Sequence, residues 1–319
     1  MLYYILSILA LLCWSGSDLF SKIGTREQEK NSHWKVVFAV GSIMGLHFFI
    51  TLISGAVIDS TVGVDALPKV VASLLYTDFK PIDFINYFPV AALYILAMVL
   101  GYIGLRYIEL SISSPICNSS GALAFLLCLL FGIFSVEDIT RIIIIGVLLI
   151  TVGIVALGFV EQREDEEIKK ARREKANRKY TKSILAFLLP ISYLIIDALG
   201  TVGDEFIFAN SDITDYAANS AFEFTFLLLA IFAFIWLKFV KKDTIFKGNK
   251  NLFWGGLCET VGQIFYMAVM FSDFSVGMVI ISAYCAISVL WSRIFLREKM
   301  SWKHYAAIAT VIAGIVILG

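Results

Sequence analysis

Two apolar stretches decide the fold: IIIIGVLLITVGIVALG at residues 142–158 and YAAIATVIAGIVILG at residues 305–319. They align at an offset of 161 residues without a gap, and the alignment extends back to Gly101 and Gly262. Self-similarity at a fixed offset indicates an internal repeat. The identical pairs include Ser111 with Ser272, Ser114 with Ser275, Glu137 with Glu298, and Gly153 with Gly314.

The composition places most of the chain in a membrane. Of 319 residues, 59% are hydrophobic and 16% are charged, which is too apolar for one or two soluble domains. A helix of roughly 20 apolar residues spans the hydrocarbon core, because it satisfies its own backbone hydrogen bonds where lipid cannot. Ten such segments are predicted, near residues 2–23, 35–57, 84–107, 110–134, 139–160, 183–203, 215–239, 251–271, 275–297 and 302–318. The predicted fold class is an all-α integral membrane protein.

The loop charges predict the orientation of these segments. Cytoplasmic loops of membrane proteins carry an excess of Lys and Arg. Of the 26 Lys and Arg residues, 23 lie in or beside the loops that follow the first, third, fifth, seventh and ninth segments. That side is predicted to be cytoplasmic, so both termini are expected outside a multi-pass protein of the plasma membrane.

Each half of the chain has five segments, an odd number, so the second half is predicted to cross the membrane in the opposite sense to the first. We expect a five-helix repeat over residues 1–160, a charged cytoplasmic linker over residues 161–182 and a second five-helix repeat over residues 183–319. The linker is either a solvated segment or a contact for anionic lipid. Inverted repeats build many secondary transporters, because two near-equivalent halves can exchange conformations. One chain holds both repeats, so a monomer suffices.

Particular residues link the chain to a known family. The first segment contains Trp14, Ser15 and Gly16, and each closing segment follows a Glu and contains Gly: Glu137 with Gly146 and Gly153, Glu298 with Gly314. In these features the chain resembles the drug/metabolite transporter superfamily, in its bacterial form with two EamA-type repeats. The resemblance implies ten helices and transport of small organic solutes, commonly outward and driven by a proton gradient or by exchange. The predicted outward termini oppose the orientation usual among such transporters.

Helix ends and breaks are also predicted. The polar run SISSPICNSSG at residues 111–121 contains Pro115, which predicts a break in the fourth segment. Carbonyls freed there could contact a substrate, while the small residues equally permit close helix packing. Glu137 and Glu298 stand just before the closing segments, so we expect them to cap helix amides rather than to act in transport.

Ionisable residues inside the predicted spans are the best indicators of a transport pathway, because a charge at bilayer depth is costly and usually lines a cavity. Asp18 and Asp197 are equivalent positions, since Trp14 and Tyr193 each stand four residues earlier on the same helix face. Each Asp either contacts substrate or holds helix packing through hydrogen bonds. Four carboxylates qualify: Asp18, Asp197, Glu223 and Glu259.

Two polar rows extend this set. Glu259, Gln263 and Tyr266 are spaced by four and three residues, so they share one face of the eighth segment. That face is expected to line the cavity, the alternative being a buried polar seam between helices. Asn219 lies one turn before Glu223, which is either a proton carrier or a structural acid.

The charge balance predicts the substrate class. No Lys or Arg lies near the middle of a predicted span, so the cavity should be net negative. Phosphorylated or dicarboxylate solutes would need fixed cations. Cationic, zwitterionic or neutral organic metabolites are therefore expected, with aromatic faces available for an ammonium group from Trp14, Tyr193, Phe222, Tyr266 and Tyr284. His47 has no carboxylate or cysteine partner in a recognisable metal spacing, which favours an interhelical hydrogen bond.

No nucleophile motif, phosphate-binding loop or metal-ligand spacing is present, so no enzyme activity, cofactor or metal site is predicted. Nucleic-acid binding is not expected either, because the basic residues lie in membrane loops. The first interpretation is a secondary active transporter, coupled to protons or working by exchange. The alternatives are a passive channel or facilitator for a small solute or divalent cation, and a membrane sensor that does not transport.

Overall fold

The computed structural model describes residues 1–25, 29–133, 140–163, 184–244, 250–270, 280–298 and 300–318. The chain is all-α, as predicted, and no β-strand occurs within these ranges. Most of the linker, and Glu137, lie outside them. The helices are α1 (Leu2–Gly24), α2 (Ser32–Thr61), α3 (Lys69–Leu75), α4 (Pro81–Gly104), α5 (Leu110–Cys117), α6 (Ser120–Leu130), α7 (Arg141–Arg163), α9 (Ile184–Asn210), α10 (Asp215–Ile235), α11 (Lys250–Met270), α13 (Tyr284–Trp291) and α14 (Trp302–Leu318), with the short segments η1 (Val64–Ala66), η3 (Trp236–Val240) and η4 (Ser292–Leu296).

The chain is a multi-span helical membrane protein. The described part of each of the ten predicted segments is mostly helical, with turns at residues 105–107, 118–119, 131–132 and 283. α11 is long enough to span, with 21 residues, but it is less apolar than the other long helices, since it carries polar side chains that include Glu259 and Gln263. Among the described residues, six segments are long and apolar enough to cross a membrane: Leu2–Gly24, Ser32–Thr61, Pro81–Gly104, Leu110–Leu130, Ala186–Asn210 and Asp215–Val240. Three shorter apolar helices are Arg141–Leu157, Ile280–Leu296 and Trp302–Ile317.

The fourth predicted segment contains the break expected at its proline. Pro115 lies inside α5, which ends two residues later, and α6 begins only at Ser120. Proline supplies no backbone N–H, so one helix hydrogen bond is lost there. The Ser119 hydroxyl donates to the Pro115 carbonyl at 2.7 Å and satisfies that group at the junction.

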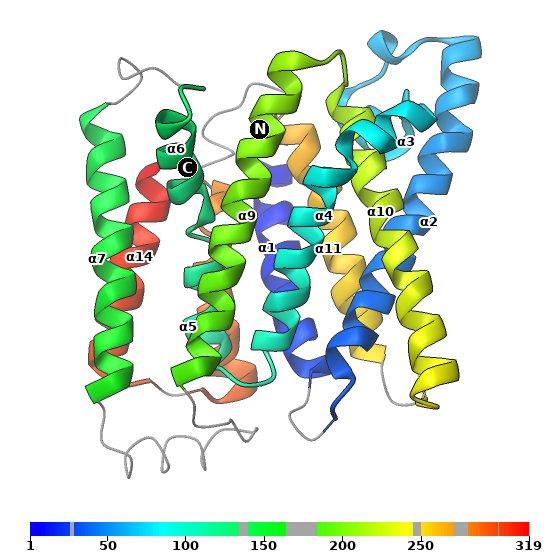
Figure 1. The fold of residues 1–319 in the computed structure, drawn as a ribbon. Helices are drawn as coiled ribbons and strands as arrows, with labels where there is room; N and C mark the ends of the chain where they lie inside the picture. The colour runs from blue at the N-terminus through cyan, green and yellow to red at the C-terminus, as the bar shows by residue number, and fades with distance from the viewer. Residues whose placement is uncertain are drawn as a thin grey trace.

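Pairs of helices build the bundle (Figure 1). α7 packs on α14, α2 on α10, α1 on α11, and α4 on α9. Further helix pairs are in contact. They include α2 with α11, α10 with α4, α1 with α13, and α9 with α6. In Figure 1, α7 and α14 form one side of the molecule, α2 and α10 form the opposite side, and α1, α4, α9 and α11 lie between them.

Glycines allow the closest of these approaches. A Cβ atom on Gly153 of α7 would lie 2.9 Å from the backbone nitrogen of Val311 in α14. A Cβ atom on Gly314 of α14 would lie 2.9 Å from the backbone nitrogen of Ile150 in α7. Close helix contact through small residues is typical of packing in membranes.

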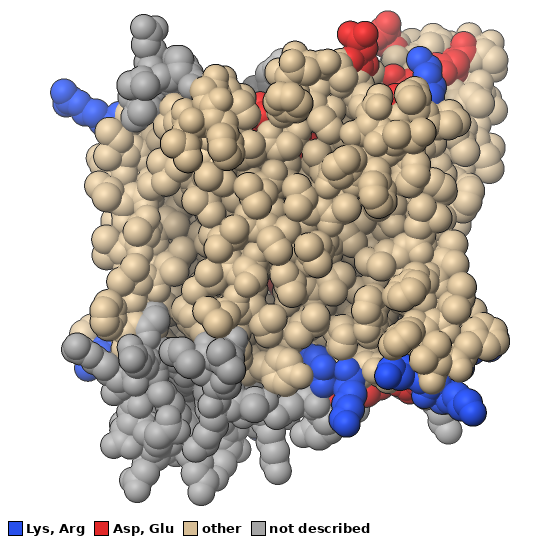
Figure 2. Space-filling model, in the orientation of Figure 1, with Lys and Arg blue, Asp and Glu red and all other residues tan. Residues whose placement is uncertain are grey.

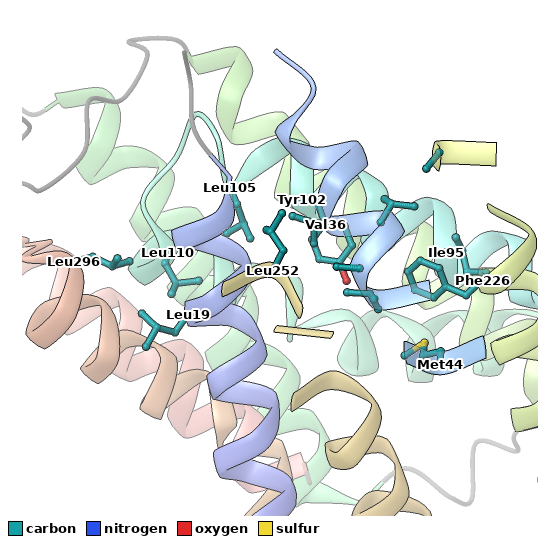
Figure 3. Close-up of a cluster of buried hydrophobic side chains, with 14 residues drawn as sticks. Leu19, Val36, Met44, Ile95, Tyr102, Leu105, Leu110, Phe226, Leu252 and Leu296 are labelled. Carbon is teal, nitrogen blue, oxygen red and sulfur yellow. The ribbon is translucent and has the colours of Figure 1, made fainter. Parts of the chain in front are cut away.

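Buried apolar side chains join the central helices (Figure 3). Leu19, Met44, Tyr102, Phe226 and Leu252 come from α1, α2, α4, α10 and α11 and belong to one cluster of buried residues. The outer surface of the bundle is also apolar, as expected of a surface that faces lipid. On α7 the exposed side chains include Ile142, Ile144, Ile145, Leu148 and Val152.

Two charged side chains fix the connection between α4 and α5. Lys22, at the end of α1, is fully buried and donates hydrogen bonds to the carbonyl oxygens of Leu105 and Ile108. Glu298 Oε2 accepts from the backbone N–H of Ser111 at 3.2 Å and from its hydroxyl at 3.3 Å. Glu298 therefore caps a helix, as predicted, but the helix is α5 in the first half of the chain rather than α14, which follows it.

Candidate functional site

A cavity of about 870 Å³ lies among the central helices. Its walls come mainly from α1, α4, α5, α6, α9, α10, α11 and α13, with single or paired side chains from α2, α7 and α14. Glu223 is the one predicted site residue outside its lining. The other nine line it: Trp14, Asp18, Tyr193, Asp197, Asn219, Glu259, Gln263, Tyr266 and Tyr284.

The charged side chains among the described residues of the cavity wall are all acidic. Among the described residues that line the cavity there is no Lys, Arg or His. A cavity with this charge attracts cations and repels anions, most strongly where it is shielded from bulk water. The carboxylates are Asp18, Asp197, Asp204, Glu205, Asp215 and Glu259.

Asp18 is held from two neighbouring helices. Its Oδ2 accepts hydrogen bonds from the hydroxyls of Ser114 in α5 and Ser288 in α13, each at 2.6 Å. Within the described part of the chain, no group donates a hydrogen bond to Oδ1. This oxygen is also not fully buried. The serines thus orient the carboxylate and leave Oδ1 facing the cavity.

Asp197 repeats this arrangement on α9. Its Oδ2 accepts a hydrogen bond from the hydroxyl of Ser120 in α6 at 2.6 Å. Its Oδ1 likewise has no hydrogen-bond partner among the described residues and is not a buried atom. The two predicted readings of these aspartates, packing contact and ligand contact, are therefore compatible, because each uses a different carboxylate oxygen.

Asp204 is a cavity residue that sequence reasoning missed. The hydroxyls of Tyr87 and Tyr94 in α4 donate to its two carboxylate oxygens, each at 2.5 Å. The predicted sixth segment ended at residue 203, whereas α9 continues to Asn210. Asp204 stands two helical turns after Asp197, and this seven-residue spacing was the signal that could have found it.

Glu259 and Tyr102 complete the part of the wall nearest Asp18. Glu259 lies beside Ser17 and close enough to Asp18 for their charges to interact. Tyr102 of α4 lies within electrostatic reach of both carboxylates and is 7% exposed. Its hydroxyl has no hydrogen-bond partner in the described ranges. Leaving a buried polar group unpaired costs about 1–3 kcal/mol, so such groups are rare.

Aromatic rings cluster in the cavity wall. The ring of Trp14 lies 5.1 Å from that of Tyr266 and 5.6 Å from that of Tyr284, measured between centroids. A ring face attracts an ammonium group by about 2 kcal/mol when both are shielded from water. Three of the predicted aromatic residues, Trp14, Tyr266 and Tyr284, therefore meet in the cavity wall, while Tyr193 of α9 lines the cavity without a ring contact to them among the described residues.

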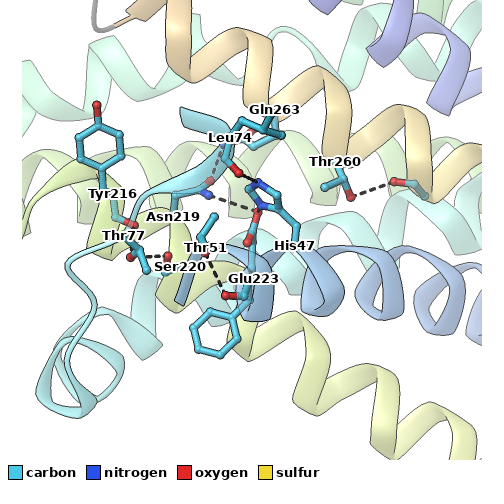
Figure 4. A network of polar contacts seen from close by, with 12 residues as sticks. His47, Thr51, Leu74, Thr77, Tyr216, Asn219, Ser220, Glu223, Thr260 and Gln263 are labelled. Atoms are coloured by element: carbon cyan, nitrogen blue, oxygen red, sulfur yellow. Dashed lines mark hydrogen bonds and ion pairs between the residues drawn. The ribbon is translucent and has the colours of Figure 1, made fainter. Parts of the chain in front are cut away.

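A polar network extends from the cavity wall into the protein (Figure 4). Gln263 donates to Asn219 at 3.2 Å, and Asn219 donates to Glu223 Oε1 at 3.2 Å. The same oxygen lies 2.7 Å from His47 Nδ1 of α2. His47 Nε2 lies 3.2 Å from the carbonyl oxygen of Leu74 in α3. His47 thus makes the expected interhelical hydrogen bond, and its partner is a carboxylate that the sequence pattern did not reveal.

The contact between His47 and Glu223 requires a proton. The Leu74 carbonyl only accepts hydrogen bonds, so the imidazole carries a hydrogen on Nε2. The 2.7 Å contact of Nδ1 with Glu223 then needs a further hydrogen, on the ring or on the carboxyl group. Without it, two lone pairs would face each other where Glu223 is 1% exposed. Loss of this proton would break one of the two His47 contacts, because the single remaining hydrogen can be on only one ring nitrogen.

No group of three or more His, Cys, Asp or Glu side chains that could hold a metal ion occurs within the described ranges. No protein-family model matches the chain, and no curated protein matches it.

Proposed function

We propose that the protein is a secondary transporter that moves a small cationic or zwitterionic organic solute by alternating access. The observation that carries the proposal is the charge of the cavity, whose described lining includes six carboxylates and no basic residue. An organic cation that leaves water loses hydration energy, which fixed carboxylates and aromatic faces replace. An anionic solute would find no such replacement.

The packing of the helices supports a ten-helix architecture of two inverted repeats, as in the drug/metabolite transporter superfamily. In that architecture α1, α2, α4 and α7 correspond to α9, α10, α11 and α14. Exchanging each helix for its counterpart turns the α1–α11 contact into α9–α4 and the α2–α11 contact into α10–α4, and both pairs occur. A two-fold axis requires such reciprocal contacts.

Individual residues follow the same exchange. A Cβ atom on Gly262 would lie 2.5 Å from Trp14 Cδ1, and a Cβ atom on Gly101 would lie 2.9 Å from Tyr193 Cδ2. Gly101 and Gly262 differ by the repeat offset of 161, and Trp14 and Tyr193 each stand four residues before an aspartate. The contact is thus present in both halves, which supports the equivalence of Asp18 and Asp197.

The distribution of surface charge supports a cytoplasmic location for the heavily basic loops. Figure 2 shows Lys and Arg gathered along the lower edge of the molecule and Asp and Glu gathered at the upper right edge, with few basic side chains above. The lower edge carries the ends of α1 and α4 and the starts of α2 and α9 (Figure 1). By the positive-inside rule this edge is cytoplasmic, and the N-terminus is outside.

The His47–Glu223 pair is the proposed site of proton coupling. It binds a proton whose loss breaks an interhelical contact, so protonation favours one packing of α2, α3 and α10 over another. Asn219 and Gln263 connect the pair to the cavity wall, where a bound cation would alter the orientation of their amides. Binding of solute and binding of the proton would thereby influence each other.

Transport measurements in proteoliposomes test the proposal. Labelled organic amines should enter by a saturable route that is accelerated by unlabelled amine on the opposite side. Asp18→Asn and Glu259→Gln should reduce this flux by about tenfold or more, since each removes a charged contact. Asp65→Asn, which neutralises an exposed acid in η1, is the matched control. Flux without saturation or exchange would instead identify a channel, and transport of anions alone would refute the proposal.

A second measurement addresses coupling. Glu223→Gln and His47→Gln should leave amine exchange intact while removing acceleration by a pH gradient, because neither amide takes up a proton. Melting temperatures of both variants report whether the pair is only structural. Retention of normal pH-driven flux by both variants would exclude the pair as the coupling site.

A further inference from the structure

We infer that the cavity binds organic diammonium ions, with one ammonium at Asp18 and the other at Asp197. This inference rests on the proposed function, since it names the class of cation that the same cavity takes. It starts from a duplication: each aspartate is held through Oδ2 by serine hydroxyls at 2.6 Å and leaves Oδ1 open to the cavity.

The two aspartates belong to separate acidic groups in the cavity wall: Asp18 lies within electrostatic reach of Glu259, and Asp197 lies within reach of Asp204. Ser114 in α5 holds Asp18, whereas Ser120 at the start of α6, beyond the break between these helices, holds Asp197. Cys117 lies between those serines in the chain, lines the cavity and is within electrostatic reach of both carboxylates. A diammonium ion can place one ammonium in each group, with hydrogen bonds of about 2.8 Å to each aspartate.

The Asp18 end offers more than charge. The Tyr102 hydroxyl is buried, lacks a hydrogen-bond partner among the described residues, and lies near both Asp18 and Glu259. An ammonium has three N–H donors and no acceptor. Asp18 Oδ1, Glu259 and the Tyr102 oxygen supply three acceptors, so a primary ammonium bound there would satisfy the hydroxyl that the protein leaves unpaired.

The Asp197 end provides a second negative centre of different composition. Asp204 lies close enough to interact electrostatically with Asp197. Both Asp204 oxygens already accept hydrogen bonds from Tyr87 and Tyr94. Asp204 therefore adds negative potential, while Asp197 Oδ1 remains the open acceptor. Two negative centres on facing repeats match a solute with a positive charge at each end.

Binding of a homologous series to the purified full-length protein tests this inference. The probes are α,ω-diamines from ethane to octane, monoamines of the same chain lengths, and the corresponding ω-amino acids, measured by calorimetry. Affinity should rise to a maximum at an intermediate diamine length and exceed that of the equal-length monoamine about tenfold or more. A monoamine control of each length removes the contribution of the methylene chain.

Variants assign the two ends. Asp18→Asn and Asp197→Asn should each lower diamine affinity to that of the monoamine, Tyr102→Phe should weaken both amines several-fold, and Asp65→Asn should change neither. Melting temperatures confirm that each variant is folded. Equal affinity for diamines and monoamines at every length would overturn the diammonium assignment while leaving the transport of cations standing. Binding of no amine at all would overturn both.

Discussion

Replacing Gly153 or Gly314 with Ala tests the reciprocal contact between α7 and α14. The added Cβ atom would lie 2.5 Å from Val311 Cγ2 at position 153 and 2.7 Å from Ile150 Cγ1 at position 314. Carbon atoms prefer about 3.5–4.0 Å, so the helices must separate by roughly 1 Å. Overpacking of this kind costs about 1–3 kcal/mol, partly offset by about 1 kcal/mol of better helix propensity for Ala.

Gly121 of α6 provides the matched control. A Cβ atom there would meet nothing within 4 Å, so Gly121→Ala gains helix propensity without a clash. The difference in unfolding free energy between either interface variant and Gly121→Ala therefore isolates the clash, expected at about 1–3 kcal/mol. Thermal unfolding of the purified protein in detergent ranks the three variants by stability.

The double variant sharpens the test. Gly153 and Gly314 are on the same interface, so once one Ala has moved the helices apart the second should cost less than it does alone. Interface variants as stable as Gly121→Ala would refute the close packing. A large cost at one glycine and none at the other would refute its two-fold character.

Two further predictions concern the loops. Glu298→Gln should lower stability by about 1 kcal/mol, measured by thermal unfolding, because the start of α5 loses the charged acceptor at Ser111. At the other site, burial raises the pKa of Asp243, but hydrogen bonds from Lys35 and Asn31 and the charge of Lys35 outweigh it and hold the pKa below its ordinary value of 3.8. The stabilisation of the folded state is therefore present above pH 3.8 and is lost as the pH falls through the lowered pKa. Asp243→Asn should accordingly make the melting temperature less dependent on pH in this acidic range. A variant whose melting temperature changes with pH as much as that of the unmodified protein would contradict this.

Several features of the site could be predicted from the sequence. Lipid imposes a local requirement, that each spanning segment be helical and apolar, so an acid within such a segment is conspicuous without knowledge of its neighbours. Asp18, Asp197 and Glu259 were found for this reason, and all three line the cavity. Asp204 was missed because the end of a helix depends on what covers it, and α9 runs seven residues beyond the predicted segment.

The sequence by itself determined the membrane class, the helical segments and the charged loops, and it indicated a repeat, because each depends on residues near one another or at a constant offset. Only the tertiary structure decided the partners of the acids. Ser114 is 96 residues from Asp18, and His47 is 176 residues from Glu223. Helices in lipid associate through shape and a few polar contacts rather than through a hydrophobic pattern, so these pairings follow from how the whole bundle packs.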